Sequence, residues 1–155
     1  MKRFGTLSVV GLMLMVGSLV AKEAGDADQL KDIKCPVSGK DINAEACKEF
    51  HEGKVYFCCN NCAAAFEKDS DKFATKANYQ LFATKQFEQK ACPMSGKPVN
   101  DEVVAEVGKV KVKLCCEGCQ GKVNDADDAG KLELTFSEKA FENGFAKVEK
   151  KEEKK

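Results

Sequence analysis

The chain has 155 residues, with 25 basic and 25 acidic side chains, nine cysteines and no tryptophan. A balanced charge does not provide the basic field that nucleic-acid-binding proteins use, so we expect no nucleic-acid partner. The length suffices for one ordinary domain or two very small ones, and very small domains usually need disulfides, a metal ion or a packed neighbour.

The N-terminal residues have the pattern of a secretory signal peptide. Lys2-Arg3 supplies a positive start, and residues 4–20 are almost wholly apolar or small. Cleavage after Ala21 would remove residues 1–21. The alternative is a membrane anchor, although the apolar segment is short for a transmembrane helix. We therefore expect a periplasmic or secreted protein that is free of the membrane after cleavage. Residues 22–34 are polar and indicate a linker.

Cysteines then recur in register, which indicates a duplicated unit. The sequence Cys58-Cys59-Asn60-Asn61-Cys62 is followed 57 residues later by Cys115-Cys116-Glu117-Gly118-Cys119. Cys35 and Cys92 precede these clusters at one common interval, and each opens a Cys-Pro-x-Ser-Gly-Lys sequence. The predicted organisation is a first repeat at 35–90, a second repeat at 91–146 and a charged tail at 147–155.

Each repeat predicts a tight turn followed by a β-hairpin. Ser38-Gly39-Lys40 is typical of a turn in which glycine supplies a positive φ. In the first repeat we expect the hairpin turn at residues 52–54, around Gly53. In the second repeat, residues 103–107 and 110–114 alternate or are β-branched around a two-residue turn at Gly108-Lys109. Both cysteine clusters therefore come at the end of a strand.

Helices are expected after the clusters, followed by a closing strand or turn. The sequence after Cys62 favours a helix with Phe66 and Phe73 inward, and the signal after Cys119 is weaker. Leu132–Phe136 predicts a strand, with residues 78–82 as its weaker counterpart. The predicted fold class is α+β, as two tandem small units, each a β-hairpin with a cysteine knuckle followed by one helix. The two units are expected to pack together, since one alone would be marginal.

Four thiols per unit suit a soft or borderline metal ion. Zn²⁺ accepts four thiolates at about 2.3 Å, and sulfur also favours Cu⁺. Cys59 is the difficult ligand, because adjacent residues of an extended chain point to opposite faces. It would complete the site through a turn, bind transiently or remain a free thiol. The candidate metal ligands are Cys35, Cys58, Cys59, Cys62, Cys92, Cys115, Cys116 and Cys119.

Two alternatives to metal binding stay open. The first is a disulfide-stapled interaction module without metal, which an exported compartment permits. The second, less favoured, is a thiol-disulfide oxidoreductase, because units this short lack room for the usual βαβ scaffold. Covalent haem attachment is excluded because its Cys-x-x-Cys-His motif needs a histidine where Ala63 and Gln120 stand.

The remaining thiol and the single histidine indicate no further site. Cys47 aligns with Val104 and His51 aligns with Gly108, so neither belongs to the common set. They are interpreted as packing or surface residues. With no second histidine there is no Ser/His/Asp set, so we do not expect an enzyme; a protein partner cannot be named.

The cysteine spacing resembles that of the TRASH and YHS metal-binding families. Val55-Tyr56-Phe57-Cys58, Cys62 and Phe66 match the YHS strand and helix, whereas Ser38 stands where that family places its first cysteine. Cys59 and Cys116 are additions to the pattern. The two repeats are also similar to exported tandem proteins of planctomycete-type bacteria. The resemblance implies a small treble-clef-like or TRASH-like module that binds heavy metals for sequestration or trafficking.

Overall fold

The computed structural model describes residues 30–149, so the predicted signal peptide and the last six residues of the tail lie outside the described residues. The elements of the first half are β1 (Asn43–Phe50), β2 (Gly53–Phe57), α1 (Asn60–Lys68), a short 3-10 turn η1 (Asp71–Phe73), α2 (Ala74–Ala83) and β3 (Phe87–Gln89). Those of the second half are β4 (Asn100–Val107), β5 (Val110–Leu114), α3 (Glu117–Asp125), α4 (Asp128–Phe136), α5 (Glu138–Gly144) and β6 (Phe145–Lys147).

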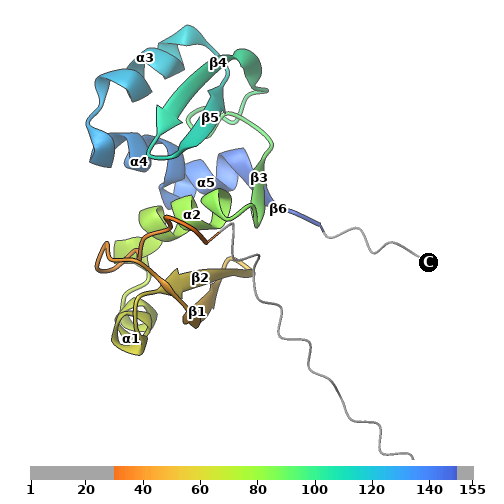
Figure 1. Cartoon of the computed structure of the whole chain (residues 1–155). Helices are drawn as coiled ribbons and strands as arrows, with labels where there is room; N and C mark the ends of the chain where they lie inside the picture. Colours follow the sequence, from red (N-terminus) through yellow and green to blue (C-terminus); the bar gives the residue numbers. More distant parts are fainter. Residues whose placement is uncertain (1–29, 150–155) are drawn as a thin grey trace, which may run out of the picture.

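Mixed helices and short antiparallel strands confirm the α+β class. The described strands form three two-stranded antiparallel sheets, which pair β1 with β2, β4 with β5, and β3 with β6. Figure 1 shows the two hairpins at opposite ends of the molecule, with α2, α4 and α5 between them. None of the helices in the described part of the chain is long and apolar enough to cross a membrane.

Both hairpins form, but the first turn differs from the prediction. In the second hairpin Val107 pairs with Val110 across Gly108-Lys109, and Gly108 has a φ of 58°. In the first, Phe50 pairs with Gly53, so the turn is His51-Glu52 rather than residues 52–54. Gly53 is instead the first residue of β2, where a Cβ would lie 2.6 Å from Leu81 Cδ2. Close packing against α2, not the turn, requires glycine there.

The prediction of a strand at Leu132–Phe136 is wrong, because these residues complete helix α4. Asp127 is its N-cap, and the Asp127 side chain accepts a hydrogen bond from the Gly130 N–H. The counterpart at residues 78–82 likewise lies inside α2. Each half therefore has more than the single predicted helix. The closing strands are β3 and β6, which lie later in each half and pair with each other.

Phenylalanine rings join the two halves in one connected core. Phe145 of β6 lies 4.8 Å from Phe82 of α2 and 5.2 Å from both Phe136 and Phe141, measured between ring centroids. Phe141 also lies 4.9 Å from Phe87 of β3. Each such pair contributes roughly 0.5–1.5 kcal/mol beyond the area it buries. Since residues of both halves share these contacts, the repeat boundaries at 35–90 and 91–146 stay predictions.

Glutamine side chains close the outer edges of β2 and β5. The Gln80 side chain accepts from the Tyr56 N–H at 2.6 Å and donates to the Tyr56 carbonyl at 3.0 Å. Gln89 makes the same pair of bonds with Lys113, at 2.9 and 2.6 Å. Unpaired strand edges invite association, so these amides stabilise the isolated hairpins that carry the cysteines. Gln86 bonds in the same way to Lys54.

Candidate metal centre

Three sulfurs of the first half come together at the end of the β1–β2 hairpin. The Sγ atoms of Cys35, Cys58 and Cys62, which we call the first cluster, all lie within 4.8 Å of one another. Cys35 is 1% exposed, while Cys58 and Cys62 are half-buried. Cys58 follows the last residue of β2, and Cys62 lies in the first turn of α1. The end of a strand and the start of a helix thus aim two sulfurs at the same point.

The second half repeats this arrangement. The Sγ atoms of Cys92, Cys115 and Cys119, the second cluster, lie within 4.8 Å of one another. Cys92 is fully buried, and Cys115 and Cys119 are half-buried. These are the two groups of cysteine, histidine or carboxylate side chains, within the described residues, whose spacing suits a metal ion.

The Cys-Pro-x-Ser-Gly turn brings the upstream cysteine to each cluster. The Gly39 N–H donates to the Cys35 carbonyl at 2.8 Å, and Gly39 has the expected positive φ of 70°. The turn places Ser38 Oγ 3.2 Å from Cys58 Sγ, and Ser95 Oγ lies 3.2 Å from Cys115 Sγ. The two serines are functional candidates that the sequence reasoning missed. Their signal was the recurrence of serine at one place in both turns.

The turns also favour the thiolate form of the upstream cysteine. Burial opposes ionisation of Cys35, but the Ser38 hydroxyl and the backbone N–H groups of Ser38, Cys58 and Val37 outweigh it and lower its pKa to about 7. Cys92 is also lowered to a pKa of about 7, against burial, by Ser95 and nearby backbone N–H groups. A thiolate is the form that binds metal, so these sulfurs are prepared for that role.

The pKa of the cluster cysteine in the first turn of α1 or α3 shifts in the opposite direction. Burial, followed by the neighbouring sulfurs of Cys58 and Cys59, raises the pKa of Cys62 to about 12. Burial and the same kind of neighbours raise the pKa of Cys119 to about 12. In a cluster without metal, these opposite shifts favour ionisation of the upstream cysteine and keep the helix cysteine protonated. Binding of a cation would release protons from the cluster.

Cys59 and Cys116, both predicted as ligands, lie outside the two groups of close sulfurs. Both are exposed, and their Sγ atoms lie 3.7 Å from those of Cys58 and Cys115. Each is the N-cap of its helix, yet neither thiol makes a capping hydrogen bond. The backbone N–H of Cys62, near the Cys59 thiol, is the leading cause that lowers the Cys59 pKa.

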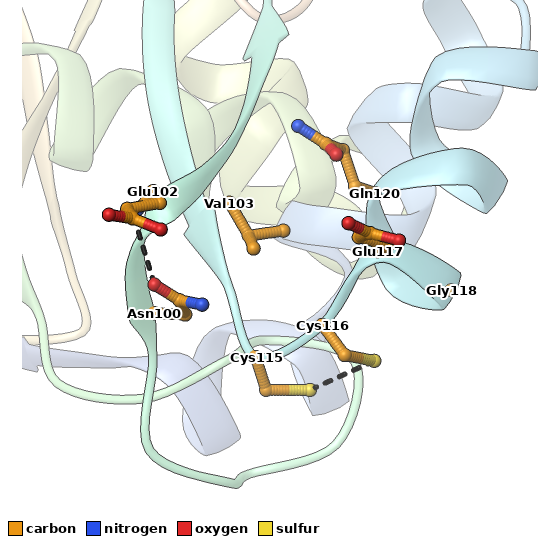
Figure 2. Close-up of a pocket in the computed structure, with 8 residues that line it drawn as sticks. All are labelled: Asn100, Glu102, Val103, Cys115, Cys116, Glu117, Gly118 and Gln120. Carbon is orange, nitrogen blue, oxygen red and sulfur yellow. Dashed lines mark hydrogen bonds between the residues drawn. The ribbon is translucent and has the colours of Figure 1, made fainter.

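An open hollow of about 610 Å³ lies beside the second cluster. Figure 2 shows Cys115 and Cys116 at one end, with Asn100 and Glu102 of β4 on one side and the start of α3 on the other. The hollow is mostly polar in its side chains and gives solvent access to the Cys116 thiol. Its lining residues are Asn100, Glu102, Val103, Cys115, Cys116, Glu117, Gly118 and Gln120.

Cys47 and His51 belong to neither cluster. Cys47 is exposed on β1, opposite Tyr56. His51 lies in the first hairpin turn, where its Nε2 is 3.0 Å from the Glu138 carboxylate of α5. These positions agree with packing or surface roles and leave the sulfur clusters as the candidate site.

Comparisons with known proteins identify no relative. No protein-family model, no curated protein and no solved structure matches the chain. The likeness to TRASH and YHS modules therefore rests only on the sequence pattern of cysteines and aromatic residues and stays an interpretation.

Proposed function

We propose that the protein is an exported, non-enzymatic metal-binding protein that holds one Zn²⁺ or Cu⁺ ion in each sulfur cluster, for sequestration or trafficking. The observation that carries the proposal is the approach of three sulfurs to within 4.8 Å of one another, twice in one chain. The tandem, TRASH-like organisation is part of the same proposal.

The choice of metals follows from the donor atoms. Thiolates prefer Cu⁺ and Zn²⁺ over hard cations such as Mg²⁺ or Ca²⁺. Three sulfurs match the lower coordination numbers that Cu⁺ accepts, whereas tetrahedral Zn²⁺ needs one further ligand. Cys59 in the first half and Cys116 in the second are the nearest candidates for that ligand, since each sulfur lies 3.7 Å from a cluster sulfur.

Metal analysis combined with thiol titration tests the proposal. The full mature protein is purified without added reductant, and bound metal and free thiols are measured before and after thiol modification. We expect about two ions per chain, released when the thiols are modified. Absent metal together with absent free thiols would favour the disulfide-stapled module instead. Catalysed reduction of insulin disulfides would favour the oxidoreductase.

A further inference from the structure

We propose that Cys59 and Cys116 are exchange ligands, through which a metal ion passes between the buried sulfur cluster and a thiolate of a second molecule. The inference rests on the proposed function and concerns the two cysteines that the clusters do not include. For Cu⁺, which the three cluster sulfurs can hold by themselves, it assigns these two cysteines a role in transfer rather than in holding the ion. The partner is identified by its chemistry, as a molecule that presents a free thiol.

The exposure of the sulfurs increases in one direction across each site. In the second half Cys92 is fully buried, Cys115 and Cys119 are half-buried, and Cys116 is exposed. The first half has the same order from Cys35 to Cys59. A molecule approaching from solvent therefore meets Cys59 or Cys116 before any other sulfur of the site.

The exposed sulfurs are close to the clusters, and neither is tied down as a side-chain helix cap. The separation from the neighbouring cluster sulfur is 3.7 Å in both halves. Cys59 and Cys116 have nearly the same extended backbone, with φ of −163° and −161°, and neither caps its helix through its side chain. Because each thiol is exposed, rotation about its χ1 angle can move the sulfur between the cluster and solvent.

The hollow beside Cys116 gives the second molecule a place to bind. Its volume of about 610 Å³ is large enough to admit the side chain that carries an incoming thiol. Figure 2 shows the Cys116 sulfur next to that of Cys115 at one end of this space, with the Glu117 side chain nearby. An acceptor thiol in the hollow would therefore lie beside Cys116 without any change in the backbone.

The exchange balances as a substitution of sulfur ligands. Cys116 loses its proton and binds the ion as one metal bond to a cluster sulfur breaks, and the released cluster thiolate takes up that proton. An acceptor thiol then loses its proton and forms a metal–sulfur bond. The remaining bonds to the cluster and to Cys116 break as acceptor thiolates replace them, and each released thiolate takes up the proton that an acceptor thiol has lost. No electrons are transferred, and the metal keeps its oxidation state throughout.

The test measures, in the mature full-length protein, how much metal is bound and how fast the metal is transferred to another molecule. Wild-type, Cys59→Ser, Cys116→Ser and double-variant proteins are loaded with Cu⁺, which three sulfurs can hold without a fourth ligand, and bound metal is counted. Release of the ion is then followed with glutathione as thiol acceptor and, separately, with a chelator that has no thiol. Cys47→Ser is the matched control, since it removes an exposed thiol outside both clusters.

We expect the double variant to keep two ions and to transfer them to glutathione at least about tenfold more slowly. Each single variant should slow only one of the two ions, and Cys47→Ser should behave as wild type. Unchanged transfer in the double variant would overturn the inference, as would loss of bound metal, which would make these cysteines permanent ligands. Cys59→Ala and Cys116→Ala repeat the test without the serine hydroxyl, whose oxygen can bind metal. A wild-type protein that binds no metal would refute the proposed function itself.

Discussion

The first and second clusters share their sulfur geometry although the residues around them differ. In both, a serine hydroxyl lies 3.2 Å from the sulfur that follows the hairpin. The next helix begins with Asn60-Asn61 in the first half and with Glu117-Gly118 in the second. The turn and the hairpin end, which are common to both, therefore set the positions of the sulfurs. The start of the helix sets the charge and the flexibility around them.

The strongest test of this equivalence removes the buried sulfur of each cluster. Cys35→Ser and Cys92→Ser should each abolish one bound ion and leave the other in place. The loss of affinity at the altered cluster should exceed the roughly 100-fold effect that substitutions in the outer shell of a metal site reach. Metal analysis and chelator competition measure it. Loss of both ions from either variant would show that the clusters depend on each other.

The serine hydroxyls provide a second comparison, through pH. Ser38→Ala and Ser95→Ala remove a hydroxyl that lowers the pKa of Cys35 or Cys92, so the pKa of that thiol should rise from about 7. Metal displaces the proton, so affinity at the altered cluster should fall a few-fold near pH 7 and recover once the pH exceeds the raised pKa. Chelator competition as a function of pH measures this. A response in only one variant would mean that the two turns are not equivalent.

Exchanging a single charge should alter the rate of metal uptake. Glu117→Asn gives the second half the residue found at the corresponding position of the first, and Asn60→Glu makes the reverse change. A carboxylate at the start of the helix, close to the cluster, attracts cations. Zn²⁺ uptake should therefore slow a few-fold in Glu117→Asn and become faster in Asn60→Glu. Stopped-flow uptake at low and high salt measures the effect, which salt should reduce. Equal uptake rates in wild type and both variants at low salt would show that this carboxylate does not speed the approach of the ion.

The smallest expected difference concerns release to a chelator. Gly118 and Gly121 lie in α3, and glycine loses more conformational freedom on ordering than other residues. We expect the second cluster to empty first. Comparing the surviving site in Cys119→Ser with that in Cys62→Ser measures this, and earlier release from the first cluster would contradict it.

A matched variant sharpens that prediction. A Cβ at Gly121 would meet no atom within 4 Å, so Gly121→Ala should stabilise α3 without a clash. The gain of roughly 0.5–1 kcal/mol corresponds to about a two- to fivefold slower loss of metal from the second cluster. No change would show that the helix is already ordered before metal binds.

Local features of the sequence were enough to predict the hairpins and the sulfur clusters. The repeated Cys-Pro-x-Ser-Gly turn predicted the positive φ of Gly39, and β-branched residues around Gly108 predicted the second hairpin. Six of the eight predicted ligands lie in the two clusters, which local spacing and a strand end suffice to explain. Whether Cys59 and Cys116 bind metal stays a prediction.

Features that depend on distant contacts were not predictable in the same way. Alternating Leu132, Leu134 and Phe136 suggested a strand, but the cap at Asp127 begins a helix whose last residue, Phe136, is fully buried. The sequence pattern assigned Gly53 to the hairpin turn. The contact that explains this glycine, with Leu81, arises only when α2 packs on the hairpin, so the sequence could not reveal it. The pairing of Gln80 and Gln89 with strand edges likewise requires the assembled fold.

The pairing of β3 with β6 has a consequence for when the protein becomes functional. Phe87 pairs with Lys147 and Gln89 with Phe145, so a segment synthesised well after β3 completes a sheet begun in the first half. A chain that emerges N-terminus first from a ribosome cannot close this core until β6 is free. We expect metal loading to follow the emergence of β6 rather than to proceed one half at a time.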